Sequence, residues 1–456
     1  MTADTHKLLR FFFAATSVFW GLSDPHSAAL AAPPSPIRQV FVIVLENEGY
    51  NFTFGARSPA PYLSKTLVRK GMLLTGYYGI GHASLDNYIA MISGQAPNYA
   101  TQSDCQIYSD FKGSISADGQ AVGHGCVYPS SVQTAADQLD HAGLSWKSYS
   151  GDMGNDPKRE SLTCGHPRLG DSDVTLHAQP ASQNVPADQY ATRHNPFVHF
   201  HSIIDSQSCN RNVVSLAVLQ SDLSSVATTA NFSFITPNLC HDGHDGGSAK
   251  KACVNNEPGG LISADAFLRR WVPAITGSPA FSADGLLVIT FDEADLDFSH
   301  DAATGNFIVS GGDASACCNE QAGPSIFPDQ IVFGAHDKGS GILGPGGGRI
   351  GAVLLSPRIQ PATRSGAEYN HYALLKTVEK IFGLPYLGFA ADSNVKPLDW
   401  IQRKPHQFAV HSARPKCRGG YGKYREPPSA GGPPVPNVVP IGANHLRESS
   451  SRGCQG

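Results

Sequence analysis

The sequence has little charge and lacks the marks of several common protein classes. Charged residues make up 16% of the 456-residue chain, the net charge is −4, and there is no Lys/Arg-rich run. A basic surface for nucleic acid is therefore not expected. The absence of any Cys-x-x-Cys pair argues against a zinc site built from thiolates. No apolar run reaches the ~20 residues that a membrane-spanning helix needs, so we expect no transmembrane segment.

The amino terminus has the pattern of a secretion signal. A basic start is followed by the apolar stretch Phe11–Trp20 and then by the small residues Ala29-Leu30-Ala31. A membrane anchor is the alternative, but roughly ten apolar residues are too few to span a bilayer. We predict that residues 1–31 are a signal peptide, that the mature chain begins near Ala32, and that the protein is secreted or periplasmic.

The cysteines fit an exported protein. An even number of cysteines in an oxidising compartment favours disulfide bonds, although their pairing cannot be read from the sequence. The ten cysteines are Cys105, Cys126, Cys164, Cys209, Cys240, Cys253, Cys317, Cys318, Cys417 and Cys454.

Short apolar runs alternate with helical patterns along the chain. The runs resemble buried parallel strands, and the patterns between them place apolar side chains on one face of a helix. This alternation predicts an α/β fold, a mainly parallel sheet sandwiched by helices. The predicted strands are Val40–Leu45, Phe232–Ile235, Leu286–Phe291, Gln330–Phe333 and Ile350–Leu355, and the clearest helices are Tyr62–Lys70, a helix capped by Ser263, and His371–Phe382.

Composition divides the chain into a main domain and a tail. We expect the main domain to cover residues 32–402. Residues 100–230 are less regular and are interpreted as an insertion or cap beside the core. Residues 403–456 are rich in Pro, Gly, Ser and Arg and are interpreted as a low-complexity tail.

Polar and acidic residues follow the predicted strands. Ligand sites in α/β sheets form beyond the carboxyl ends of strands, so these residues are candidates for a metal site. Carboxylates and imidazoles suit divalent ions such as zinc, manganese, iron or calcium. Taken singly, an acidic pair after a strand could equally be a solvated turn. The residues concerned are Glu46 and Asn47, then His241, Asp242 and His244, then Asp292 and Glu293, and finally His371.

A further segment supplies a candidate nucleophile. Leu85, Tyr88, Ile89 and Ile92 recur at helical spacing, and Gly94 can end the helix. Ser84 then falls at the N-cap, where free N–H groups and the helix dipole favour an anion. A serine at a helix start is usually an ordinary cap, so the catalytic interpretation depends on the surrounding ligands.

The ordered motifs resemble the phosphoesterase family of bacterial acid phosphatases and phospholipases C. The resemblance spans roughly residues 39–390 and is carried by Val42–Asn47, Tyr77–Gly94, Arg193–Phe197, Pro237–Cys240, Ile289–Glu293 and Asn370–Pro385. It implies an alkaline phosphatase-like fold with one or two divalent metal ions. Ser84 would be the nucleophile, held at a metal with Glu46, Asp292 and Glu293.

The resemblance also implies roles for the remaining residues. Asp242, His244 and His371 would hold a second metal, and Asn87 would contact the phosphate. Asn47 and His82 would be further contacts. His241 is an added candidate catalytic residue at a position where many relatives have another polar residue. The family commonly has Ser-Leu-Pro-Asn where this chain has Asp86 in place of the proline.

These features predict a secreted, metal-dependent phosphomonoesterase of the acid-phosphatase type. Its substrate would be a small phosphate ester, with a phospholipid or phosphoinositide included in that class. Two alternatives stay open: a phospholipase C that acts on diesters, and a non-catalytic exported binding protein on a phosphatase scaffold. Only about 50 low-complexity residues follow the core, which favours the smaller phosphatase.

Overall fold

The computed structural model describes residues 36–245, 252–300, 307–325 and 346–400. The predicted signal over 1–31, the predicted tail over 403–456 and the predicted strand Gln330–Phe333 lie outside these residues. Among the helices that are described, none has both the length and the apolar character needed to cross a membrane.

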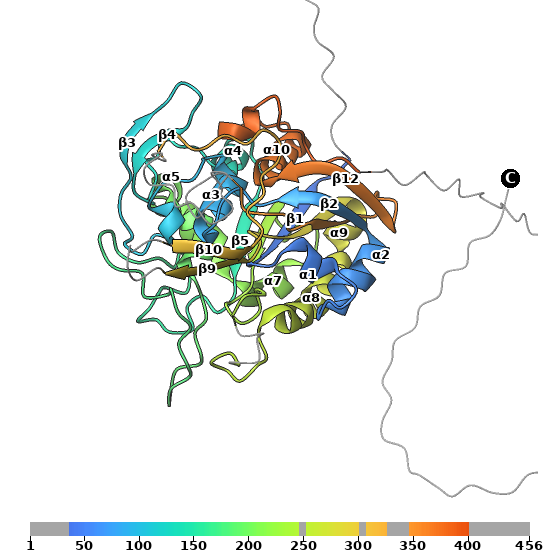
Figure 1. The fold of residues 1–456 in the computed structure, drawn as a ribbon. Helices are drawn as coiled ribbons and strands as arrows, with labels where there is room; N and C mark the ends of the chain where they lie inside the picture. Colours follow the sequence, from blue (N-terminus) through green and yellow to red (C-terminus); the bar gives the residue numbers. More distant parts are fainter. Residues whose placement is uncertain (1–35, 246–251, 301–306, 326–345, 401–456) are drawn as a thin grey trace, which may run out of the picture. The chain divides into compact units, whose positions relative to one another are not determined.

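A mixed sheet of eight strands forms the centre of the described chain (Figure 1). Its order is β12-β2-β11-β8-β1-β7-β5-β6, and every neighbouring pair is parallel except those that β11 makes with β2 and β8. The prediction of a mainly parallel sheet is therefore confirmed. The strands are β1 Gln39–Leu45, β2 Met72–Tyr78, β5 Trp146–Ser150, β6 Val213–Ser215, β7 Phe232–Thr236, β8 Gly285–Phe291, β11 Ala352–Leu355 and β12 Thr363–Asn370.

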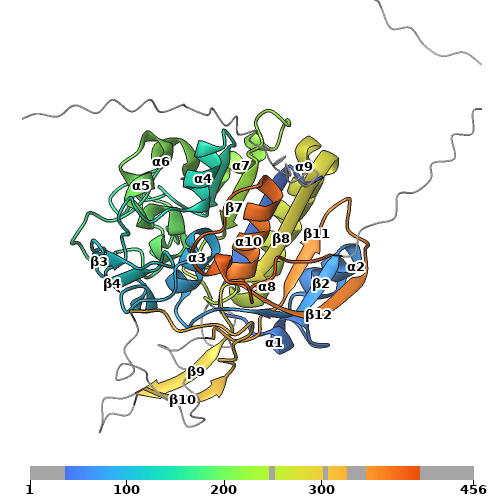
Figure 2. The same cartoon turned by 90° about the horizontal axis from the view of Figure 1, so that it is seen from above.

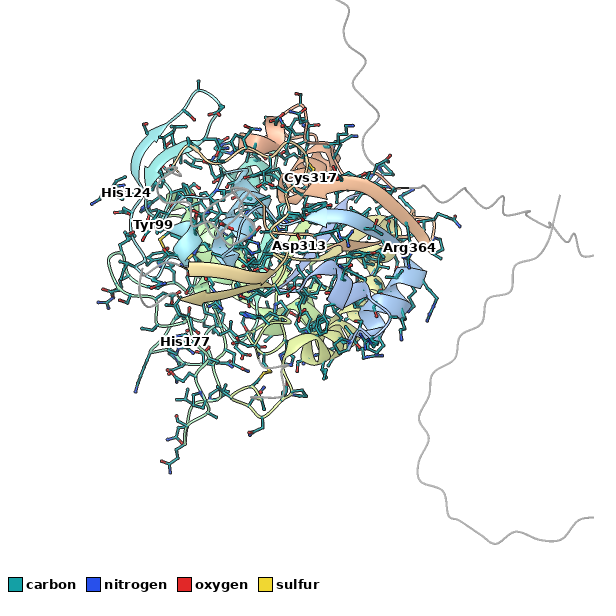
Figure 3. All side chains as sticks on the ribbon, viewed as in Figure 1. Tyr99, His124, His177, Asp313, Cys317 and Arg364 are labelled. Atoms are coloured by element: carbon teal, nitrogen blue, oxygen red, sulfur yellow. A yellow bond between two sulfur atoms is a disulfide. The ribbon has the colours of Figure 1, made fainter. Side chains whose placement is uncertain are left out.

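The apolar runs identified the strands that are buried on both faces. β1, β7, β8 and β11 are buried at every position, as expected for central strands. The predicted direction was wrong for β11, which runs antiparallel to its neighbours. β12 was missed because it is an edge strand with only Tyr369 and Asn370 buried, and Arg364 lies on it at the rim of the sheet (Figure 3).

Helices cover both faces of the sheet, with α3, α4 and α10 on one side and α8 and α9 on the other (Figure 2). Two antiparallel hairpins, β3–β4 and β9–β10, lie outside the main sheet. The α-helices are α1 Tyr50–Phe54, α2 Val68–Lys70, α3 Ser84–Ser93, α4 Ala135–His141, α5 His201–Ile204, α6 Gln207–Asn212, α7 Leu219–Asp222, α8 Gly260–Thr276, α9 Pro279–Asp284 and α10 His371–Phe382, and the hairpin strands are β3 Lys112–Ile115, β4 Ala121–His124, β9 Leu296–His300 and β10 Phe307–Gly312.

Capping residues explain where the predicted helices start and stop. α10 has the predicted bounds: the Asn370 side chain accepts a hydrogen bond from the Ala373 N–H, and Gly383 ends the helix at φ 69°. α8 starts before the predicted cap, so Ser263 lies inside it and accepts a hydrogen bond from the Gly259 N–H. The predicted helix Tyr62–Lys70 is a wider π-helical turn, Tyr62–Leu67, that continues into α2.

The region 100–230 contributes to the core as well as to its surroundings. β5 and β6 both come from it and extend the main sheet beyond β7. Part of the predicted insertion therefore belongs to the sheet itself. The helical turn Thr192–His194 from this region contacts α3, which brings its side chains close to the predicted nucleophile.

The expected disulfide bonds are present among the described cysteines. The pairs are Cys105–Cys126, Cys164–Cys209, Cys240–Cys253 and the adjacent residues Cys317–Cys318. Cys317 is labelled in Figure 3. Cys417 and Cys454 lie outside the described residues. The first three bonds join segments that are 13 to 45 residues apart in the sequence, and such links stabilise the fold by restricting the unfolded chain.

Candidate active site

A cavity of about 470 Å³ lies at the carboxyl edge of the sheet. Glu46 follows β1, Asp292 and Glu293 follow β8, and α3 starts at Ser84 after the loop that leaves β2. The parallel direction of these strands brings the loops to one edge, as the sequence predicted. The cavity is lined by Glu46, Asn47, His82, Ala83, Ser84, Asp104, Arg193, His244, Glu293, Asp295 and Leu296.

Ser84 is the first residue of α3 and is buried. Its Oγ donates a hydrogen bond to Glu46 Oε1 at 2.7 Å. The N-cap position is occupied by Ala83, one residue earlier than predicted, at φ 136°. A residue other than glycine rarely adopts this backbone conformation, so the surrounding contacts must hold Ala83 in place. The Ala83 N–H donates to Glu293 Oε1 at 3.2 Å.

Asn87 holds the loop before Ser84 and has a different environment from the predicted one. Its Oδ1 accepts the Ile80 N–H at 2.8 Å. Its Nδ2 donates to the carbonyl oxygens of Gly81 and Ala83 and to Asp86 Oδ1, at 2.9 to 3.1 Å. These contacts engage both the oxygen and the NH₂ group of the amide, and they tie Asn87 to the loop that leads to Ser84.

Three buried carboxylates gather beside Ser84. Glu46 Oε2, Asp242 Oδ2 and Asp292 Oδ2 each have no hydrogen-bond partner, and each residue is at most 1% exposed. Unpaired buried anions are costly unless a cation neutralises them. One oxygen each from Glu46 and Asp292 and one nitrogen of His194 lie within 4.8 Å of one another. This donor set fits a divalent metal ion.

The charges around these carboxylates affect them in opposite ways. Burial opposes ionisation of Glu46, but His194 and Arg193 outweigh burial and hold the pKa of Glu46 well below its usual range. Burial raises the pKa of Asp292 well above its usual range, and the charges of Glu293 and Glu46 add to this effect. Full ionisation of Asp292 next to Glu46 is therefore unfavourable unless further positive charge is present.

Arg193 and His194 are site residues to which sequence reasoning assigned no role. His194 Nε2 lies 3.0 Å from Glu46 Oε1, and its ring stacks on Tyr88 at 5.2 Å. Arg193 Nη2 lies 3.5 Å from Glu46 Oε1. The only signal for them was the resemblance of the segment Arg193–Phe197 to the phosphoesterase family. Nothing else in the composition of that segment indicates that it lies close to Ser84, which is more than 100 residues away in the sequence.

His82 pairs with Glu293 at the same cavity. His82 Nδ1 lies 2.5 Å from Glu293 Oε2, while the other oxygen of Glu293 accepts the Ala83 N–H. His82 Nε2 is buried and has no partner. The predicted ligand Glu293 therefore orients His82 and the strained Ala83, and the free Nε2 of His82 is available to a bound molecule.

Of the other predicted residues, Asn47 and His244 are at the cavity. Asn47 lies in the left-handed region at φ 59°, and its N–H donates to Asp292 Oδ1. His244 is half exposed, with Nδ1 3.7 Å from Glu46 Oε1, and its N–H donates to Asp242 Oδ1. Burial alone would lower the pKa of His244, but Glu46 raises it to about 9.

The structure separates His371 and His241 from the predicted constellation. His371 Nε2 lies 2.5 Å from the Asp292 carbonyl oxygen, and Nδ1 lies 3.2 Å from the Tyr77 hydroxyl. Both ring nitrogens therefore have partners within the protein, and His371 is not among the residues that place donor atoms together beside Ser84, which are Glu46, His194 and Asp292. The strand β12, which the sequence did not predict, ends at Asn370 and so places His371 beside the main chain of Asp292.

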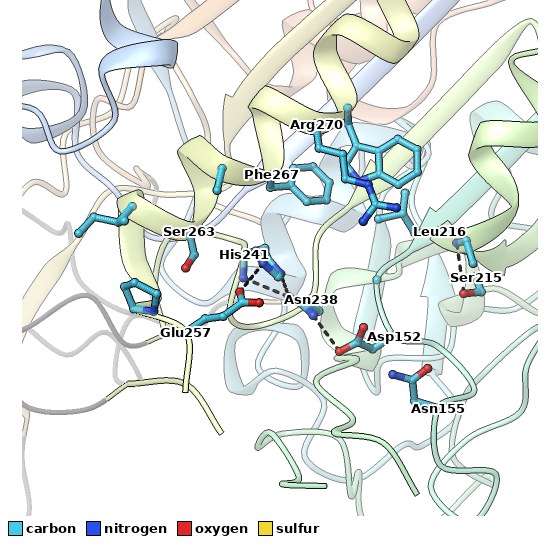
Figure 4. Close-up of a pocket in the computed structure, with 16 residues that line it drawn as sticks. Asp152, Asn155, Ser215, Leu216, Asn238, His241, Glu257, Ser263, Phe267 and Arg270 are labelled. Atoms are coloured by element: carbon cyan, nitrogen blue, oxygen red, sulfur yellow. Dashed lines mark hydrogen bonds and ion pairs between the residues drawn. The ribbon is translucent and has the colours of Figure 1, made fainter. Parts of the chain in front are cut away.

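His241 lines a different cavity, of about 530 Å³ (Figure 4). Its Nε2 lies 2.7 Å from Glu257 Oε2 and its Nδ1 lies 2.6 Å from Asn238 Oδ1, while Asn238 in turn contacts Asp152. No residue lines both this cavity and the one beside Ser84. The predicted catalytic role of His241 therefore has no support in its contacts.

Comparison with known protein families gives a match over most of the chain. A model of the Phosphoesterase family matches residues 56–385. The chain belongs to this family. The family resemblance read from the ordered motifs is confirmed. The match begins after Glu46, which the structure nevertheless brings to Ser84.

The phosphoesterase chain is similar to proteins named as phosphatases. It is 24% identical over 404 residues to a probable acid phosphatase of Kluyveromyces lactis, covering 86% of this chain and 71% of that protein. It is 28% identical over 297 residues to a phosphate-repressible acid phosphatase of Penicillium chrysogenum, covering 62% and 56%. A phosphatidylinositol-3-phosphatase of Mycobacterium tuberculosis is 22% identical over 374 residues, covering 82% and 86%. The chain thus spans little more than half of the Penicillium protein.

Among solved structures, this phosphoesterase is similar to members of the alkaline phosphatase superfamily. One, from Vibrio parahaemolyticus, is 12% identical with a TM-score of 0.40, covering 77% of this chain and 68% of that one. The wild-type alkaline phosphatase PafA is 10% identical with a TM-score of 0.39, covering 81% and 99%.

Proposed function

We propose that this phosphoesterase hydrolyses phosphomonoesters, with Ser84 as nucleophile and one or two divalent metal ions beside it. The enzyme class, a hydrolase of phosphoric ester bonds, follows from family membership. The observation that carries the finer proposal is the 2.7 Å hydrogen bond from Ser84 Oγ to Glu46, whose second oxygen is buried without a partner next to those of Asp242 and Asp292. Glu46, Asp242, Asp292 and His194 would hold the metal.

The side chains present can perform both halves of the reaction. Ser84 Oγ attacks the phosphorus atom, its proton passes toward Glu46, and the alcohol leaves from the opposite side. The free Nε2 of His82 can supply the proton that the leaving oxygen needs. Water then attacks the phosphoserine and gives a proton to His82, while the proton on Glu46 returns to Ser84 Oγ as phosphate leaves. A bound divalent ion would supply positive charge to the phosphoryl oxygens.

The relatives favour monoesters over diesters. The proteins reported above are named as acid phosphatases or as a phosphatidylinositol phosphatase. This supports phosphomonoester hydrolysis over a phospholipase C-type reaction, and it retains a phosphoinositide among the possible substrates. Export to a periplasm or to the medium is part of the proposal, and the disulfides support it because they persist in oxidising compartments.

A paired substrate assay tests this function. Purified protein, supplied in turn with zinc, manganese, iron(II) or calcium, is assayed on p-nitrophenyl phosphate and on p-nitrophenylphosphorylcholine. We expect faster hydrolysis of the monoester. A strong preference for the choline diester would favour the phospholipase C alternative. No turnover with any of these metals, in protein that still binds phosphate, would favour the non-catalytic binding protein.

A further inference from the structure

Asp104 places a carboxylate beside the nucleophile, at the amino end of α3. The residue follows the helical turn Thr101–Ser103 and has φ 54°. Its Oδ1 accepts the N–H of Leu85, the residue after Ser84, at 3.1 Å. Its Oδ2 lies 3.8 Å from Arg193 Nε. Asp104 also lines both the cavity of Ser84 and an adjoining cavity of about 710 Å³.

The two groups that Asp104 engages are those that would attract a phosphate here. A free N–H in the first turn of a helix and an arginine beside it are both anion-binding groups. The cavity contains a further group that is free to bind, because His82 Nε2 is buried there without a partner. A phosphoryl group next to Ser84 would therefore approach the Leu85 N–H and Arg193, which the Asp104 carboxylate already contacts.

We propose that Asp104 competes with the phosphoryl oxygens of substrate and product for the Leu85 N–H and Arg193. Asp104 then sets the affinity of the site for phosphate: like charges in one cavity repel, so free phosphate is held less tightly than it would be without the carboxylate. Asp104 determines affinity in this proposal, which rests on the proposed function because it needs the phosphoryl group to bind at Ser84.

The substitution Asp104→Asn separates this role from helix capping. Asparagine keeps an oxygen to accept the Leu85 N–H, removes the charge, and tolerates the left-handed backbone at least as well as aspartate. Asp171→Asn is the matched control, because Asp171 is exposed and lines neither cavity. Isothermal titration calorimetry measures the dissociation constant of inorganic phosphate at pH 7 with manganese-loaded proteins of equal metal content.

We expect Asp104→Asn to bind phosphate roughly tenfold more tightly than wild type, and Asp171→Asn to bind like wild type. Unchanged binding in Asp104→Asn would overturn the proposal and leave Asp104 as a helix cap. Weaker binding would also overturn it and would show that Asp104 orients Arg193. If Asp104→Asn does not fold, Asp104→Gly, which suits the same φ, gives the deciding measurement.

Turnover measured in parallel separates this inference from the proposed function. Tighter phosphate binding in Asp104→Asn without hydrolysis of any monoester by wild type would support the competition and reject the enzymatic proposal. Hydrolysis by wild type with identical phosphate binding in both proteins would support the enzyme and reject the competition.

Discussion

His371 holds the main chain of Asp292: its Nε2 lies 2.5 Å from the Asp292 carbonyl oxygen, while Nδ1 faces the Tyr77 hydroxyl. Burial lowers the pKa of His371 to about 4, so the ring is neutral near pH 7. A neutral ring with this geometry donates from Nε2 and accepts at Nδ1 from Tyr77. His371 thereby fixes the loop that presents Asp292, and its effect on the site passes through that loop.

We therefore expect His371→Ala to reduce stability more than metal content. It leaves the Asp292 carbonyl and the Tyr77 hydroxyl buried without partners, which should cost about 2–4 kcal/mol of unfolding free energy. Denaturant unfolding and metal analysis of the folded protein measure the two effects. His124→Ala, at an exposed position on β4 (labelled in Figure 3), is the control. Loss of metal with unchanged unfolding would restore the ligand role.

Asp292→Asn should remove metal while leaving the loop in place. The Oδ1 of Asp292 accepts the N–H groups of Asn47 and Glu293, and its Oδ2 has no partner. Asparagine can keep the first oxygen in its position, but it puts an NH₂ group where an anionic ligand is needed. Metal content after equilibration should fall at least tenfold, with activity falling in proportion. Full metal content in this variant would exclude Asp292 as a ligand.

Ser84→Ala should remove turnover and retain the fold. Without Oγ the covalent step cannot occur, so we expect a loss on the order of a thousandfold or more in kcat. The hydroxyl of Ser84 donates to Glu46 Oε1, which keeps His194 Nε2 at 3.0 Å in the variant, so the unfolding free energy should change by no more than about 1 kcal/mol. Acid quench of wild type with ³²P-labelled substrate should trap label on the protein, and Ser84→Ala should trap none. Near-normal turnover in the variant would point to His82 or to a metal-activated water.

Asn87→Asp should disturb both the loop and the active site. The substitution can keep the oxygen that accepts the Ile80 N–H, but it removes the donors to Gly81 and Ala83 and puts a charge beside Asp86. We expect about 2–4 kcal/mol of lost stability and a fall in kcat at saturating substrate. Asn394→Asp, at an exposed site, is the matched control. A rise in KM alone, with stability unchanged, would instead support direct contact between Asn87 and the phosphate.

His201 should give the fold a stability contribution that depends on pH. Burial lowers the pKa of His201, but the hydrogen bonds and charges of Asp110 and Asp205, at 2.9 and 2.8 Å, outweigh burial and raise it. The contribution is therefore complete below the unfolded value of ~6.5 and is lost as the pH rises through the folded value. His201→Asn should lower the unfolding free energy by about 0.5–1 kcal/mol at pH 5.5 and by nearly nothing at pH 9. A difference that does not change with pH would reject the ion-pair explanation.

The amino-acid sequence by itself determined the parts of this protein that depend on local patterns. Continuous apolar runs identified β1, β7 and β8, because strands buried on both faces have no solvent-facing side that would carry polar residues. Helical periodicity with Gly94 and Gly383 as stops identified α3 and α10, because these glycines adopt the left-handed conformation that ends a helix. Since parallel strands end at one edge, the same reading brought Glu46 and Asp292 together, and the family resemblance added Ser84.

Tertiary structure alone decided the contacts made between distant segments. The edge strand β12 has no apolar run, so nothing local showed that it places His371 behind Asp292. The turn that holds Arg193 and His194 packs against α3, and this contact between distant segments brings both side chains to Glu46. Whether a hydrogen bond forms depends on differences of a few tenths of an ångström between donor and acceptor, which local sequence patterns do not set. The sequence could therefore name Asn87 and Glu293 as members of the site, but only the fold showed that they hold the loop around Ser84.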